Sequence, residues 1–230
     1  MSDVQQQKTH LDIDLPVVTG SEIILHYNTP SGNAPSTMGD AAFLWQTTSE
    51  TIPQGVKANG TAGPKNDDPD NNVQFPANLD SESYLVGYAV GPCSKSGYLY
   101  ENVGATIQVP QGSDTDPSKV HAPHVTDVDV TYAQDDVIAF KWTVPPGAQP
   151  GTDGDWTGVW QTEDSSDLYT QAPVATQQVT ENGSSGTLSF GDVQLRRGYA
   201  YTVGYFRGGW DAKKPTQTTL AAASAFTIPD

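Results

Sequence analysis

Short segments in which apolar and polar residues alternate recur along the chain. The alternation is clear at residues 23–27, 84–88, 137–142 and 199–206. Because successive side chains of a strand point to opposite faces, this pattern predicts β-strands with one buried face. Clusters of Gly, Pro, Asn and Asp separate these segments, as is typical of turns. No segment has a convincing helical period; residues 220–225 come nearest and allow at most one helical turn.

The second half of the chain repeats the first. The pattern Gly-Asp-x-x-x-x-Trp-Gln-Thr occurs at residues 39–47 and again at 154–162, an offset of 115 in a chain of 230 residues. Two further blocks recur in the same order, with residues 12–15 and 86–88 matching 127–130 and 203–205. Blocks that recur in one order with few insertions indicate an internal duplication.

The predicted fold class is all-β, with two tandem immunoglobulin-like β-sandwich domains from this duplication. Short strands separated by turns over about 100 residues are typical of such a sandwich. Residues 1–110 form the first predicted domain, called module one, and residues 123–230 form module two. The segment 111–122 between them is polar and has no periodicity, so we interpret it as a linker.

One block of module two resembles a known family. Residues 155–160 read Asp-Trp-Thr-Gly-Val-Trp and are similar to the Asp-Trp-x-Gly-aliphatic-aromatic signature of SKICH-type immunoglobulin-like domains. The match covers most of residues 125–230, whereas module one keeps only Asp40 and Trp45 of the signature. This resemblance implies an immunoglobulin-like fold and a targeting or protein-interaction role. We expect Trp45 and its repeat Trp160 to be core aromatics of the two sandwiches.

The chain is poor in basic residues. It contains 11 Lys and Arg against 27 Asp and Glu, for a formal net charge of −16. Proteins bind nucleic acids and anionic lipid surfaces through Lys and Arg side chains that neutralise phosphate. We therefore expect neither nucleic acid nor an anionic membrane surface among the partners.

Membrane insertion and a disulfide are also not expected. No apolar run approaches the roughly 20 residues that span a bilayer. The first residues have neither a basic head nor an apolar stretch, so we expect no secretory signal. A single cysteine, Cys93, excludes a disulfide within the chain. The expected location is the cytoplasm, or the outside of the cell after export without a signal peptide.

Two carboxylates at the beginning of the second repeat block, one just before it and one within it, are candidate metal ligands. Asp153 and Asp155 precede Trp156, and carboxylate oxygens are ligands that calcium prefers. An insertion at residues 66–72 is also rich in Asn and Asp, but it lacks the spacing of an EF-hand. Both segments equally suit turns, in which Asp side chains accept main-chain hydrogen bonds. Apart from calcium, no cofactor is expected.

Two repeated pairs of aspartates lie on predicted strands. Asp12 and Asp14, like Asp127 and Asp129, place two carboxylates on one strand face about 6.5–7 Å apart. That separation is found between the paired carboxylates of glycosidases. The favoured alternative is that these aspartates lie on the solvent-exposed face of an edge strand, where charge prevents pairing between molecules.

Aromatic residues near turns are candidates for ligand binding. Tyr98 and Tyr100 follow the Val-Gly-Tyr block of module one, Trp210 follows that of module two, and Trp156 belongs to the second repeat block. Exposed Tyr and Trp on a rigid scaffold are typical of surfaces that bind sugars or proteins. The alternative is that these rings pack onto their own loops.

No combination of nucleophile, base and metal ligands is evident. Cys93 has no counterpart in module two, and His121 and His124 supply two ligands where a zinc site needs three or four. We therefore expect a non-enzymatic protein that binds a carbohydrate or protein ligand through its loop aromatics.

Two other functions stay open. One is a self-assembling structural, surface or inclusion protein, for which a homo-oligomer is expected. The other is a metal-assisted hydrolase that uses Asp12 and Asp14, or Asp153 and Asp155.

Overall fold

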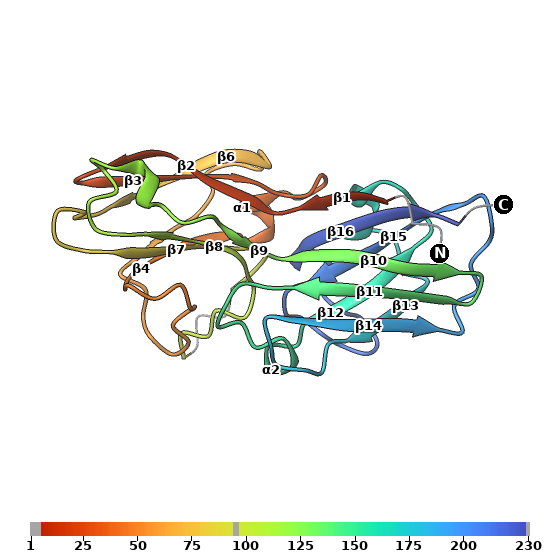
Figure 1. Ribbon diagram of the computed structural model, residues 1–230. Coiled ribbons are helices and arrows are strands. Elements are labelled where there is room, and N and C mark those ends of the chain that lie inside the picture. Colours follow the sequence, from red (N-terminus) through yellow and green to blue (C-terminus); the bar gives the residue numbers. More distant parts are fainter. Residues whose placement is uncertain (1–5, 94–96, 229–230) are drawn as a thin grey trace.

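The computed structural model describes residues 6–93 and 97–228 and consists mainly of β-strands (Figure 1). Strands account for 44% of the described residues and helices for 9%. The elements of module one are β1 (Gln6–His10), β2 (Asp12–Thr19), β3 (Glu22–Asn28), α1 (Pro35–Met38), β4 (Ala41–Gln46), β5 (Gly60–Ala62), β6 (Asp70–Pro76), β7 (Tyr84–Ala89) and β8 (Val103–Val109). The 3₁₀ helix η1 (Pro117–Lys119) lies in the expected linker.

Module two repeats this order and adds two short 3₁₀ helices. Its elements are β9 (His124–Val125), β10 (Asp127–Gln134), β11 (Val137–Thr143), α2 (Pro150–Asp153), β12 (Trp156–Trp160), η2 (Ser165–Tyr169), β13 (Ala175–Gln178), β14 (Ser185–Gly191), β15 (Ala200–Phe206), η3 (Gln217–Thr219) and β16 (Leu220–Thr227). Residues 220–225 therefore lie in a strand, not in the helical turn that their alanines allowed. In the part of the chain that the structure describes, no helix is long and apolar enough to cross a membrane.

Four antiparallel sheets form two β-sandwiches. In module one a three-stranded sheet, β2-β3-β6, faces a five-stranded sheet, β5-β4-β7-β8-β9. In module two the corresponding sheets are β10-β11-β14 and β13-β12-β15-β16-β1. The all-β fold class with two immunoglobulin-like sandwiches is thus confirmed.

The first strand of each module completes the sheet of the other module. β1 pairs with β16 over five residues, from Gln6 opposite Phe226 to His10 opposite Ala222. β9 pairs with β8 through Ala105 opposite Val125. Figure 1 shows β1 reaching across to lie beside β16. The expected boundaries therefore do not follow the sheets, because a strand crosses from each module into the other.

Each sandwich has an apolar core between its two sheets. In module one, Tyr27 and Tyr88 pack there with ring centroids 4.6 Å apart. In module two, Trp142 packs against Tyr205 at 5.8 Å. These rings come from opposite sheets, so they join the two layers of each sandwich.

The repeated tryptophans are buried, but not between the two sheets. On β4, Leu44 packs in the core of module one, whereas Trp45 faces the other side and contacts Tyr100 edge-on at 4.7 Å. Trp160 likewise lies on the outer face of its sheet, in a cluster with Leu168 of η2. The expectation that both are sandwich-core aromatics is therefore corrected: loops and η2 cover them from outside.

The two α-helices, α1 and α2, each begin at a proline and end at a glycine. Pro35 and Pro150 take the first helical turn, where a missing N–H costs nothing. Gly39 and Gly154 then adopt left-handed conformations, with φ of 87° and 76°, which end the helices. The residue that follows each glycine is a buried aspartate, Asp40 or Asp155, which lies immediately before a central strand, β4 or β12.

Candidate functional site

Asp40 is a buried carboxylate in module one. It accepts hydrogen bonds from the main-chain N–H of Gly91 at 2.6 Å, the amide of Asn33 at 2.8 Å and the hydroxyl of Tyr88 at 3.0 Å. Burial raises the pKa of Asp40 to about 6, although these three donors oppose the rise. The aspartate joins its own strand to the turn after β7.

Asp155 has the same role in module two, with one change of partner. It accepts hydrogen bonds from the N–H of Gly208 at 2.7 Å and the hydroxyl of Tyr205 at 2.8 Å, which repeat Gly91 and Tyr88. The third donor is the guanidinium of Arg207 instead of an asparagine amide. Burial raises the pKa of Asp155, and the charge of Arg207 opposes that rise.

Arg207 connects the two modules through its buried side chain. Its Nε donates to the main-chain oxygen of Val103 at 3.1 Å and its Nη2 to that of Glu101 at 2.9 Å. Asp153 lies 3.6 Å from the same Nη2. The predicted calcium ligands Asp153 and Asp155 thus face an arginine, which already supplies the positive charge that a metal would bring. Within residues 6–93 and 97–228, no group of three or more His, Cys, Asp or Glu is placed to hold a metal ion.

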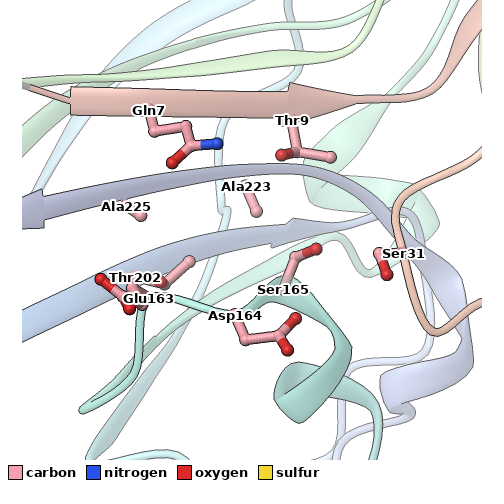
Figure 2. A pocket seen from close by; sticks show the side chains of 9 residues that line it. All are labelled: Gln7, Thr9, Ser31, Glu163, Asp164, Ser165, Thr202, Ala223 and Ala225. Atoms are coloured by element: carbon pink, nitrogen blue, oxygen red, sulfur yellow. The ribbon is translucent and has the colours of Figure 1, made fainter.

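A hollow of about 340 Å³ lies where the two modules meet, and we call it the junction hollow. It is lined by Gln7, Thr9, Ser31, Glu163, Asp164, Ser165, Thr202, Ala223 and Ala225 (Figure 2). Figure 2 shows Gln7 and Thr9 of β1 on one side and the η2 segment on the other. Both modules therefore contribute side chains to this site.

Small side chains on one sheet face create the junction hollow. In the register of β1 and β16, Gln7 lies opposite Ala225 and Thr9 opposite Ala223. Residues two apart on a strand share a face, so these four side chains face the same side of the sheet. Thr202 of β15 lies opposite Ala225 and extends this face. Because alanine side chains are small, Ala223 and Ala225 leave space above the sheet that larger side chains would fill.

The wall of the junction hollow comes from the start of η2 and the loop after β3. Asp164 caps η2 by accepting a hydrogen bond from the N–H of Ser166 at 2.9 Å, and this bond lowers the pKa of Asp164. Gly32 has φ of +92° and lies so close to Ser166 that a Cβ would come within 2.7 Å of its Cα. This close approach brings Ser31 to the rim.

The lining of the junction hollow is rich in hydrogen-bonding groups and contains no Lys, Arg or His. Thr9, Ser31 and Ser165 carry hydroxyls that donate and accept, and Gln7 adds an amide. The Thr202 hydroxyl is already used, since it donates to the main-chain oxygen of Thr162 at 2.7 Å. The set suits a neutral or cationic ligand that carries several hydroxyl or amino groups.

A second, wider hollow of about 670 Å³ lies on module one alone, along β3 and β6. Its lining includes Asn66, Asn71, Asn72 and Gln74. The Asn71 amide donates to the Asn66 side-chain oxygen at 3.1 Å, so part of this polar lining is already paired.

The aromatic residues predicted to bind ligand do not gather into one site. Trp156 is completely buried and stacks on Phe206 at 3.9 Å, and Tyr100 is 3% exposed with its hydroxyl donating to the main-chain oxygen of Val56 at 2.9 Å. Trp210 is half-buried and packs on the Trp156 cluster. Tyr98 is 44% exposed. The expectation of exposed loop aromatics is therefore corrected for Trp156 and Tyr100, which serve as packing.

The two aspartate pairs have different surroundings. Lys8 of β1 lies 3.0 Å from both Asp127 and Asp129, so these two carboxylates share a cation from the other module. In module one, Asp14 is exposed and lies 3.2 Å from His26. Neither arrangement opposes two carboxylates across a cleft, as glycoside hydrolysis requires.

Two histidines, one in the linker and one at the start of β9, contact the same acidic side chain. His124 Nε2 lies 2.7 Å from Glu50, which also contacts His121. These hydrogen bonds lower the pKa of Glu50. In the Asn- and Asp-rich insertion, Asp67 accepts two hydrogen bonds from Thr37, so it ties the insertion to α1.

Comparisons with known proteins do not show a family for this chain. No family model matches it, and no curated protein matches it. Among solved structures 117 chains match; one is described as "Biofilm associated protein - BSP domain". It is 13% identical, with a TM-score of 0.26, over 96% of this chain and 30% of that one, so this chain spans about a third of its length. A match at this level does not indicate a function, and membership of the SKICH family stays a prediction.

Proposed function

We propose that this is a non-enzymatic binding protein that holds a sugar unit of a carbohydrate in the junction hollow. The proposal depends chiefly on one feature, a hollow of monosaccharide-like size lined by hydroxyl, amide and carboxylate groups from both modules. Sugar hydroxyls both donate and accept hydrogen bonds, so a lining with both kinds of group suits them. Ligand sites commonly have volumes from about 300 Å³ upward.

The charge of the lining favours a neutral or amino sugar over an acidic one. Glu163 and Asp164 are the charged lining residues, and no basic residue in the lining balances them. An anionic ligand would meet uncompensated negative charge, in a protein whose net charge is already −16. Carboxylates strengthen hydrogen bonds from sugar hydroxyls, because a charged acceptor binds a donor more strongly.

The same lining favours ligand binding over catalysis. Glu163 and Asp164 are neighbours at the start of η2, on one side of the hollow. A glycosidase needs two carboxyl groups on opposite sides of the bond that it breaks. Ser165 has no histidine among the other lining residues that could act as its base.

The test begins with a glycan array probed with the full chain, followed by calorimetric titration of a soluble sugar that scores. Thr9→Val and Ser165→Ala each remove one hydroxyl, and each should raise Kd about threefold to tenfold, as expected for one hydrogen bond. Thr187→Val, on the exposed face of β14, is the matched control and should leave Kd unchanged.

Two outcomes contradict the proposal. A blank array excludes carbohydrate as the ligand. If Gln74→Ala weakens binding while Thr9→Val and Ser165→Ala do not, the ligand occupies the second hollow and the assignment of the site is wrong.

A further inference from the structure

Two main-chain hydrogen bonds between the modules form an equivalent pair. The N–H of Leu11 donates to the main-chain oxygen of Ala221 at 2.8 Å, and the N–H of Thr126 donates to that of Gly104 at 2.8 Å. Leu11 and Thr126 are 115 residues apart, and Gly104 and Ala221 are 117 apart, which are the offsets of the duplication. The same contact is thus made twice, in opposite directions. This is the arrangement of an interface between two identical subunits related by a two-fold axis.

The first strands of the two modules are also exchanged reciprocally. β1 adds to β16, and β9 adds to β8. Each module alone would leave the edge of its last strand, β8 or β16, without this partner. Polar contacts reinforce one of the two additions, since Lys8 of β1 pairs with Asp127 and Asp129 of β10.

A single covalent connection decides which two modules pack together. Residues 111–122 lead from β8 back to β9, and η1 is their regular element. Twelve residues can extend to about 40 Å, enough to carry a module away from its neighbour. None of the contacts between the modules requires that both come from one chain.

We propose that two copies of this chain form a module-exchanged dimer, in which module one of each copy packs on module two of the other. Every contact between modules is formed again in the dimer, so the linker and the protein concentration decide the balance. Each junction hollow then takes Gln7 and Thr9 from one copy and the η2 segment from the other. The proposal goes beyond the proposed sugar site and does not depend on it.

A disulfide across the exchanged strand reports which copy supplies β1. In a Cys93→Ser background, Gln7→Cys and Ala225→Cys place cysteines opposite each other on β1 and β16. The reduced protein is unfolded, refolded at low or high concentration, and then oxidised. We expect cross-linked monomers at low concentration and a rising share of disulfide-linked dimers at high concentration.

The control is a cysteine pair within one module. Lys141→Cys and Thr187→Cys lie opposite each other on β11 and β14, and both positions are exposed. This pair should give intramolecular cross-links at every concentration, because exchange of modules leaves it within one copy. The proposal fails if the Gln7–Ala225 pair forms no more dimer than this control at the highest concentration.

Shortening the connection provides a second test. Ala105 lies opposite Val125 and Thr106 opposite His124, so Gln108 would face Ala122 in the same register. Deleting residues 110–121 leaves one residue for the turn, whereas a hairpin needs two. We expect a dimer at all concentrations by light scattering, and a folded monomer would overturn the proposal. If this variant does not fold, the cysteine pair in the full chain decides.

Discussion

Arg207 in module two donates a hydrogen bond to the main-chain oxygen of Val103 in module one, 3.1 Å away. The same guanidinium contacts Asp155, so one side chain both balances a buried charge and joins the two modules. The equivalent position in module one is Val90, and there Asn33 replaces the missing donor. The two modules therefore supply different donors to equivalent buried carboxylates: an asparagine amide in module one and an arginine in module two.

Replacing Arg207 should lower the stability of the folded protein. Arg207→Met leaves Asp155 buried without its cation, and we expect a loss of about 3–5 kcal/mol in the free energy of unfolding. Denaturant unfolding of the variant measures this loss. Arg197→Met, which removes an exposed arginine paired with Asp135, is the control and should cost at most about 1 kcal/mol.

The asparagine of module one offers a rescue. Ala148 is the counterpart of Asn33, so Ala148→Asn with Arg207→Val copies the module-one arrangement into module two. We expect this double variant to recover part of the stability lost in Arg207→Val alone. The remaining deficit reflects the carbonyl oxygens of Glu101 and Val103, which lose their donor. If the double variant is no more stable than Arg207→Val, the two arrangements are not equivalent.

Asp40 should make the protein less stable as the pH rises through the weakly acidic range. Burial raises its pKa in the folded protein to about 6, from an ordinary 3.8. Between these values the folded state holds a proton that the unfolded state has lost, so stability falls as pH rises from about 4 to about 6. Above pH 6 the whole loss in the free energy of unfolding, about 3 kcal/mol, is present.

Asp40→Asn removes this titration. The stability of the variant relative to the wild type should therefore increase from pH 4 to pH 7, and denaturant unfolding at several pH values measures it. A stability difference that does not change with pH would show that Asp40 titrates normally.

Gly158 should not tolerate a side chain. A Cβ there would lie 2.6 Å from the ring of Trp160, which is buried and cannot move away freely. We expect Gly158→Ala to cost about 1–3 kcal/mol, as overpacking usually does. Gly191→Ala is the matched control on another strand, because no atom lies within 4 Å of the added Cβ. Equal effects of both substitutions would contradict the packing described for Trp160.

Filling the junction hollow should abolish binding without unfolding the protein. Ala225 forms part of its floor and is partly exposed, so Ala225→Leu adds bulk where there is space. We expect a loss of at least about tenfold in affinity for the sugar that binds, with little change in Tm. Unchanged affinity would place the ligand elsewhere.

The duplication and the strands could be predicted because they depend on local pattern. Alternation defines which residues face the core, and the Gly-Asp-x-x-x-x-Trp block fixes the offset between the modules. The outward position of Trp45 also had a signal, since residues 41–45 are apolar throughout and such runs indicate strands buried on both faces. The Leu-Ala-Ala-Ala run at 220–223 carried no helical period and proved to be a strand.

The exchanged strands and the junction hollow could not be predicted in the same way. Alternation assigns a face to each side chain of β1, but not the strand with which it pairs. The hollow combines Thr9, Ser165 and Ala223, which are far apart in sequence and ordinary in type. Arg207 differed from Val90 at the matching position, yet this difference alone does not reveal its buried partner.

The exchange of first strands also constrains the order in which parts of the chain can fold. Gln6 and its partner Phe226 are 220 residues apart in the chain. Contacts between residues so distant in sequence form late, because closing a long loop costs entropy before the contact repays it. The edge that β1 occupies therefore exists only after β16 has been synthesised, and until then β1 lacks this partner. A chain that stops before residue 220 keeps β1 but has no strand to receive it.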